Sequence, residues 1–225
     1  MKQPRKAIQV SMIVLILCGI MALVDGVLPV NYFQKSVIKL VLFLCCPIVY
    51  LAKNDELKCK TQFVFNRKSM MLAFGLALGV FAIIFGGYFL LKDIFDFSGI
   101  TKSLTKNIGV NRENFVFVSL YISFVNSLLE EFLFRGFAFL TLRQVSSQRF
   151  AYIFSASIFS LYHVAMMIGW FTPAVFLLVL IGLFAGGVIF NYLNAKSGTI
   201  YPSWLVHMFA NFAINFIGFI LFGIL

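Results

Sequence analysis

Charged residues are scarce in this sequence. They make up 12% of the 225 residues, whereas 61% are apolar, against about 25% charged and 45–50% apolar in an ordinary soluble domain. This composition excludes a soluble globular protein. At about 20 residues per membrane-spanning helix, the length allows at most about eight spans and leaves nothing for a second, soluble domain.

Cysteines and acidic residues are also few. The four cysteines include no CxxC pair, and three lie within apolar runs, so they indicate neither a zinc knuckle nor a disulfide framework and are interpreted as packing residues. Eighteen basic against eight acidic residues give a net charge of +10. Because these charges lie between apolar runs, we interpret them as determinants of membrane topology and expect no nucleic-acid partner.

Long apolar stretches predict an all-α, polytopic membrane helical bundle of about seven (six to eight) transmembrane helices, with residues 1–225 forming one integral-membrane domain. The first stretch is interpreted as a retained anchor, because Met21 to Asp25 make a poor signal-peptide cleavage site. The connector 92–113 is long enough for a surface helix. The predicted spans are 7–24, 36–52, 69–91, 114–140, 150–169, 172–194 and 199–224.

The distribution of Lys and Arg predicts the orientation of the spans. With the amino terminus inside, the inner segments carry eleven basic residues and the outer segments six, among them Lys35 and Lys39. Because inner loops are enriched in basic residues, this excess predicts a cytoplasmic amino terminus.

Four ionisable side chains nevertheless lie within the predicted spans. Glu130 and Glu131 are consecutive in the fourth span, His163 lies in the fifth and His207 in the seventh. Each costs a few kcal/mol to insert into a bilayer, so such a group normally faces a polar cavity and has a function there. These side chains are therefore the candidates for an active site.

Helical spacing sorts these groups, because residues four apart share a face. Glu131 and Arg135 have this spacing and predict an ion pair, which leaves Glu130 free for chemistry. The same spacing projects Asn211 together with His207, and Phe159 as a wall beside His163. Counted from the inner span ends at about 1.5 Å per residue, Glu130, His163 and His207 lie about 15, 20 and 12 Å deep, which are compatible with one site.

Three short motifs resemble those of a known family. Residues 130–136 read EEFLFRG and resemble EExxxR, residues 159–163 read FSLYH and resemble FxxxH, and residues 207–211 read HMFAN and resemble HxxxN. Their order, each on its own span, is similar to the CAAX-protease and bacteriocin-processing (Abi) family of intramembrane proteases, which includes the Ras-converting CAAX endopeptidase. The resemblance covers about residues 114–215, the expected catalytic core.

The resemblance implies an endopeptidase acting on a membrane-associated peptide or protein. Glu130 and His163 would position and deprotonate a water, His207 and Asn211 would stabilise the oxyanion, and Glu131 with Arg135 and Phe159 would be structural. Glu130 and the two histidines could also hold zinc with an open position for water. A glutamate-activated water without metal fits the same residues, so both possibilities stay open.

Other functions of membrane proteins would need different sequence features. The sequence contains no HExxH, GxSG-like or GxGD-like motif of other intramembrane proteases. A small transporter would use buried Glu and His to relay protons, but would show repeat-related broken helices. A non-catalytic bacteriocin-immunity or scaffolding protein of the same fold is the alternative. We expect a bacterial plasma membrane, with lipid and a peptide substrate as partners; the oligomeric state and the choice between a CAAX tail and a leader peptide stay open.

Overall fold

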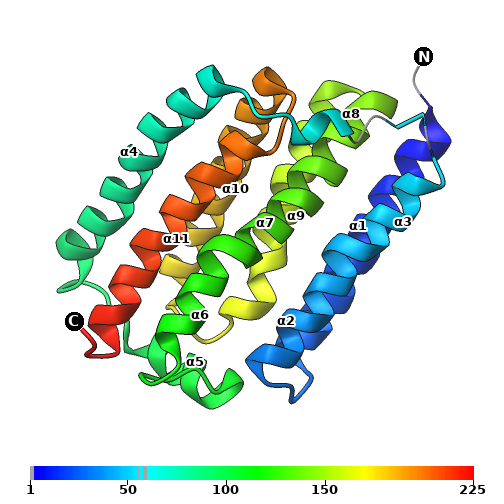
Figure 1. Cartoon of the computed structure of the whole chain (residues 1–225). Coiled ribbons are helices and arrows are strands. Elements are labelled where there is room, and N and C mark those ends of the chain that lie inside the picture. The colour runs from blue at the N-terminus through cyan, green and yellow to red at the C-terminus, as the bar shows by residue number, and fades with distance from the viewer. Residues whose placement is uncertain (1–2, 55, 58–59) are drawn as a thin grey trace.

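The computed structural model describes residues 3–54, 56–57 and 60–225, and within these ranges the chain is helical without strands. In this described part of the chain, seven helices are long and apolar enough to cross a membrane, which confirms the predicted all-α membrane bundle (Figure 1). They are Pro4–Gly26, Tyr32–Ala52, Arg67–Leu91, Phe115–Val145, Gln148–Met167, Pro173–Ser197 and Tyr201–Leu221.

The second and fourth of these spans are composite. The second consists of α2 (Tyr32–Leu40), the π-helical segment η1 (Val41–Cys45) and α3 (Cys46–Ala52). The fourth consists of α6 (Phe115–Tyr121), π-helical η3 (Ile122–Asn126), α7 (Ser127–Glu130), π-helical η4 (Glu131–Thr141) and α8 (Leu142–Val145). The single-piece spans are α1 (Pro4–Gly26), α4 (Arg67–Leu91), α9 (Gln148–Met167), α10 (Pro173–Ser197) and α11 (Tyr201–Leu221). Two connectors carry the short η2 (Lys60–Phe63) and the predicted surface helix, α5 (Ser98–Ile108).

Helix boundaries follow from capping side chains. Asn31 and Gln34 form a reciprocal capping box at the start of α2, and Ser147 caps α9 by accepting from the backbone amide of Phe150. Such caps satisfy amides that lack an intrahelical partner. Pro173 and Pro202 lie in the first turns of α10 and α11, where the missing amide has little effect.

The fourth predicted span, 114–140, ends too early. The helix continues through α8 to Val145, and Leu142 and Val145 are buried. Polar Thr141 and Arg143 interrupt the apolar run, but the helix stops only where Ser146 becomes extended. Hydropathy therefore located the apolar stretch, whereas the helix end depends on backbone conformation.

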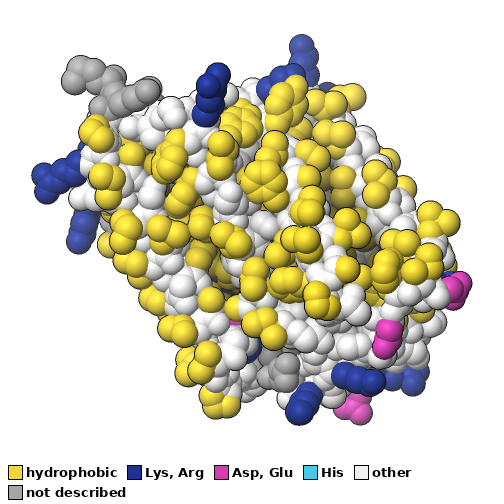
Figure 2. All heavy atoms as spheres, turned by 180° about the vertical axis from the view of Figure 1, so that it is seen from behind, with side chains coloured by type: hydrophobic (Ala, Val, Ile, Leu, Met, Phe, Trp, Pro, Cys, Tyr) yellow, Lys and Arg dark blue, Asp and Glu magenta, His cyan; other side chains and the backbone are white. Residues whose placement is uncertain are grey.

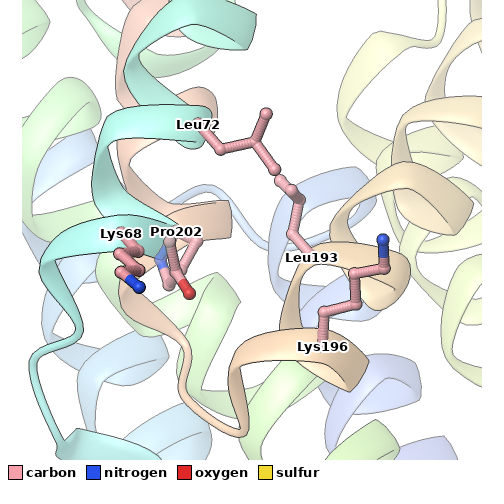
Figure 3. A pocket seen from close by; sticks show the side chains of 6 residues that line it. Lys68, Leu72, Leu193, Lys196 and Pro202 are labelled. Carbon is pink, nitrogen blue, oxygen red and sulfur yellow. The ribbon is translucent and has the colours of Figure 1, made fainter.

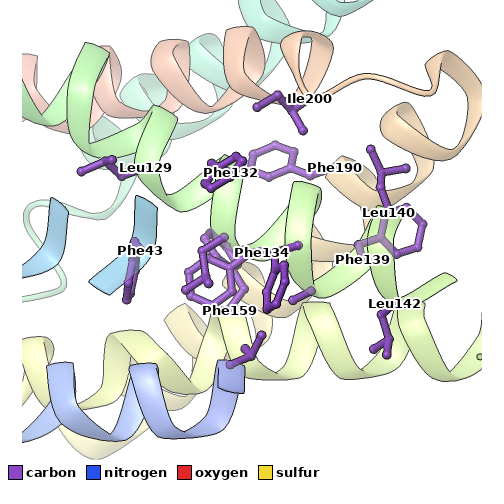
Figure 4. Close-up of a cluster of buried hydrophobic side chains, with 14 of the residues drawn as sticks. Phe43, Leu129, Phe132, Phe134, Phe139, Leu140, Leu142, Phe159, Phe190 and Ile200 are labelled. Atoms are coloured by element: carbon purple, nitrogen blue, oxygen red, sulfur yellow. The ribbon is translucent and has the colours of Figure 1, made fainter. Parts of the chain in front are cut away.

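The Phe115–Val145 span is the centre of the bundle. Its most apolar window is 44% buried inside the protein, against 11% for α4. Segment η4 packs against α1, α9 and α10, whereas α4 packs mainly along α11. Phe134 of η4 packs edge-on against Phe43 and Phe159 in the core (Figure 4). Side chains on this central span are therefore the ones best shielded from lipid.

The outer surface is suited to lipid. Leu90, Phe117 and Ile83 are 79%, 74% and 73% exposed. Figure 2 shows apolar side chains spread over one face, with Lys and Arg gathered mostly toward its two ends. This distribution matches an apolar belt between two charged interfaces, and the chain is an integral multi-pass membrane protein.

Candidate active site

Glu130 occupies the middle of the central span and is only 2% exposed. One carboxylate oxygen, Oε1, accepts hydrogen bonds from Lys39 Nζ at 2.6 Å and from Asn126 Nδ2 at 3.0 Å. Segment η3 ends at Asn126 and η4 begins at Glu131, so π-helical turns flank the carboxylate on both sides. Such turns are rare and frequently occur at functional sites.

The other carboxylate oxygen of Glu130 faces both histidines. Oε2 lies 3.8 Å from His163 Nε2 and 3.7 Å from His207 Nε2. The two imidazoles come from α9 and α11 and are 8% and 7% exposed. The structure thus brings together the three ionisable groups that were predicted from separate spans.

The second nitrogen of each histidine is anchored to an oxygen. His163 Nδ1 lies 2.7 Å from the backbone carbonyl of Phe159, and His207 Nδ1 lies 2.9 Å from Glu131 Oε1. Because both oxygens are acceptors, each Nδ1 carries the hydrogen and donates it. A neutral imidazole in this tautomer presents the lone pair of Nε2 to the space next to Glu130.

The predicted ion pair between Glu131 and Arg135 is present, with 3.4 Å between Glu131 Oε1 and Arg135 Nη1, and both side chains are fully buried. The Arg135 guanidinium lies 3.9 Å from the ring centroid of Phe159. Phe159 also contacts His163 edge-on, with 4.9 Å between ring centroids. Its predicted place as a wall beside the histidine is therefore present.

Glu131 does more than pair with Arg135. Its Oε1 also accepts the hydrogen bond from His207, across 76 residues of sequence. Spacing along one helix could not reveal this contact. Glu131 therefore orients one of the two site imidazoles as well as compensating Arg135.

Asn211 lies one turn after His207 on α11, as predicted, but its amide is engaged. Asn211 Nδ2 donates to the backbone carbonyl of Ile122 at 3.2 Å. A carboxamide has two N–H donors, so this bond leaves one hydrogen for another acceptor. The contact also joins α11 to the π-helical segment that precedes Glu130.

Lys39 and Asn126 were missed in the sequence. Lys39 was counted among the outer basic residues, which is wrong, because it is 6% exposed inside the second span and pairs with Glu130. Glu130 takes no part in the Glu131–Arg135 pair, but its Oε1 is occupied by Lys39. The sequence feature that could have revealed the burial of Lys39 is its position inside the apolar stretch 36–52. Asn126 lies four residues before Glu130, and this spacing also predicts a shared face. Glu130, His163, His207, Lys39 and Asn126 together are termed the Glu130 cluster.

A metal ion bound at Glu130 would lie close to the positive charge of Lys39. Imidazole nitrogens and a carboxylate oxygen are suitable zinc ligands. However, in the part of the chain that the structure describes, no three His, Cys, Asp or Glu side chains form a group that could hold a metal. Lys39 also places a positive charge 2.6 Å from the Glu130 carboxylate, where it would repel a divalent cation.

The Glu130 cluster is almost closed to the exterior. A surface hollow of about 290 Å³ lies where α4 and α11 begin and α10 ends (Figure 3). None of the residues of the Glu130 cluster lines it. Because Glu130 is 2% exposed, a peptide can reach its carboxylate only if neighbouring helices move. The residues that line this hollow are Lys68, Ser69, Leu72, Leu193, Lys196 and Pro202.

Comparison with known families matches the part of the chain that carries most of this cluster. Residues 112–213 match the family model described as type II CAAX prenyl endopeptidase Rce1-like. Comparison with curated proteins and with solved structures gave no match. The matched range contains Glu130, His163 and His207, whereas Lys39 lies outside it. The match over residues 112–213 supports a relation to the CAAX-protease and bacteriocin-processing family of membrane proteases, which the three motifs resemble.

Proposed function

We propose that this protein is an intramembrane endopeptidase that hydrolyses a peptide bond with a water activated by Glu130 and His163. The observation that carries the proposal is the approach of Glu130 Oε2 to both Nε2 atoms, at 3.7 and 3.8 Å, within an apolar bundle. These separations are too long for direct hydrogen bonds, and polar groups more than 3.5 Å apart can be joined through a water. The family match supports the same reaction class.

The first chemical step is attack by water. Glu130 Oε2 and His163 Nε2 both present lone pairs, so they hold the water through its two hydrogens and take one proton as its oxygen attacks the carbonyl carbon. The same groups then return the proton to the leaving amine. A positioned general base of this kind contributes about 10² to 10⁴-fold to the rate.

The second requirement is stabilisation of the negative charge that develops on the carbonyl oxygen. His207 in its doubly protonated form can donate from Nε2, and Glu131 balances the imidazolium through the hydrogen bond to Nδ1, 2.9 Å long. The free amide hydrogen of Asn211 supplies a second donor. Preorganised donors of this type act strongly in a site that excludes water.

The substrate class follows from the surroundings of the site. A membrane-associated peptide or protein can present its apolar part to the exposed apolar side chains while its backbone enters between helices. The family description names CAAX prenyl endopeptidases, so a prenylated peptide with a CAAX end is the first substrate to test, and an unprenylated leader-type peptide is the second. We place the protein in a bacterial plasma membrane, with its amino terminus in the cytoplasm.

The test compares Glu130→Gln with the wild-type protein, both reconstituted in lipid, on an internally quenched farnesylated CAAX peptide. We expect at least a 100-fold loss of kcat, because the amide cannot accept a proton from water. The matched control is Glu113→Gln, since Glu113 is exposed in a connector; this variant should cleave normally. Full activity of Glu130→Gln in folded protein contradicts the mechanism, and absence of cleavage of every peptide by the wild type favours the non-catalytic alternative.

A chelator tests the metal-free step. Treatment with 1,10-phenanthroline should leave cleavage by the wild-type protein unchanged, because the proposed base acts directly on water. Loss of activity that added zinc restores would replace this step with metal-assisted hydrolysis.

A further inference from the structure

Lys39 is a buried cation for which the matched family range does not account. It lies on α2, outside residues 112–213, and it is 6% exposed. Its neighbours along the helix are mostly apolar, and an unpaired ammonium is unfavourable at such a depth. Its position therefore requires a specific partner.

The partner is the carboxylate of Glu130. Lys39 Nζ donates to Glu130 Oε1 at 2.6 Å and to Asn126 Oδ1 at 2.5 Å. Its charge also lies 5.0 Å from the ring centroid of Tyr162 and 5.3 Å from that of Phe43. Four side chains from the second, fourth and fifth spans thus hold the ammonium, and such enclosure restricts where it can move.

The contacts of Glu130 are divided between its two oxygens. Oε1 accepts from Lys39 and Asn126, whereas Oε2 is directed at the histidines. Two bonds to one oxygen prevent the carboxylate from rotating, so the other oxygen stays next to both Nε2 atoms. A nearby cation also favours the ionised form, which is the form that can accept a proton.

We propose that Lys39 is a positioning residue of the active site, which keeps the Glu130 carboxylate ionised and directs its second oxygen at His163 and His207. The inference rests on the proposed function, because the positioned group is the proposed base. It makes the second span part of the catalytic unit. The segment next to Lys39 supports this role, because π-helical η1 begins at Val41, two residues later.

The experiment measures kcat and KM of full-length Lys39→Met and Lys39→Arg, per folded molecule, on the peptide that the wild type cleaves. Methionine is unbranched and only one atom shorter than lysine, and it removes the charge, so we expect kcat to fall about 100-fold with KM changed less than threefold. Arginine restores the charge and should recover at least tenfold of that loss. The matched control is Lys35→Met, one turn earlier on α2 and paired with Asp25 at 3.7 Å, which should keep wild-type kcat.

A stability cycle accompanies the kinetics and does not depend on activity. Lys39→Met and Glu130→Gln should each lower the unfolding midpoint in detergent, because each leaves one buried charge unpaired, and the double variant should unfold at a higher temperature than either single variant. A wild-type kcat in Lys39→Met overturns the role of Lys39. An equal loss of kcat in the Met and Arg variants, with no recovery of the unfolding midpoint in the double variant, also overturns it. Absence of cleavage by the wild type overturns the proposed function instead, and the two failures are therefore distinguishable.

Discussion

Glu131 contacts two buried basic side chains, Arg135 on its own span and His207 on α11. Its Oε1 lies 3.4 Å from Arg135 Nη1 and 2.9 Å from His207 Nδ1, and the Arg135 side chain is fully buried. Breaking a buried pair by removing one partner leaves the other charge uncompensated. The carboxylate is therefore needed for folding as well as for orienting an imidazole.

We predict that Glu131→Gln lowers the amount of folded protein more strongly than it lowers kcat per folded molecule. Arg135 would keep its charge without a carboxylate, which destabilises the fold by about 3–5 kcal/mol, while the glutamine oxygen can still accept from His207. Quantified membrane fractions and kcat per folded molecule measure the two effects. Arg135→Met in the same chain removes the stranded charge and should restore folded protein; failure to do so contradicts this explanation.

Helix packing around the Glu130 cluster depends on small and amide side chains. Gly187 of α10 lies so close to α9 that an added Cβ would come within 3.0 Å of the Ala156 Cα. Nearby, Ser155 Oγ donates to Asn191 Oδ1 at 3.1 Å, and Asn194 Nδ2 donates to Ser203 Oγ at 2.8 Å. Small residues and interhelical hydrogen bonds of this kind are typical of packing in membranes, and Asn191 and Asn194 therefore act as helix contacts.

Substitution of Gly187 tests this close approach of α9 and α10. Gly187→Val should lower the free energy of unfolding by about 1–3 kcal/mol, because the backbone of α9 must move away. Gly186→Val is the control, since nothing lies within 4 Å of a Cβ at Gly186, and its unfolding midpoint should stay near that of the wild type. The midpoints in detergent are compared directly, and equal values for the two variants would show that the contact does not restrict packing.

Across the whole molecule, seven spans place the two termini at opposite ends of the bundle (Figure 1). Lys39 is buried away from both ends of its span, so it does not belong with the basic residues near the membrane surfaces. Without it, the segments predicted to be outside carry five basic residues rather than six, against eleven inside. The correction strengthens the predicted orientation, since basic residues favour the cytoplasmic side.

We therefore predict a cytoplasmic amino terminus and a carboxyl terminus on the other side. Alkaline phosphatase, which is active only outside the bacterial cytoplasm, should be inactive when fused to the amino terminus and active when fused after Leu225. A fluorescent protein that folds only in the cytoplasm should give the reverse pattern. Activity of the same reporter at both termini would contradict the odd number of spans.

The sequence determined the features that depend on composition and on spacing within one helix. Apolar stretches gave the number of spans, and four-residue spacing gave the pairing of Glu131 with Arg135 and the place of Phe159 beside His163. Both are local properties, since hydropathy acts over about 20 residues and a helical face repeats every three to four. The convergence of Glu130 with the two histidines was also anticipated, because intramembrane ionisable groups seek a shared polar site.

The tertiary structure decided which side chains complete the site. Lys39 and Glu130 are 91 residues apart, and Asn211 and Ile122 are 89 apart. Contacts at such separations depend on which helices are neighbours and on how each is rotated about its axis, and π-helical turns alter that rotation within the second and fourth spans. No local pattern encodes this rotation, so the partner of the buried lysine and the second role of Glu131 emerged only from the packed bundle.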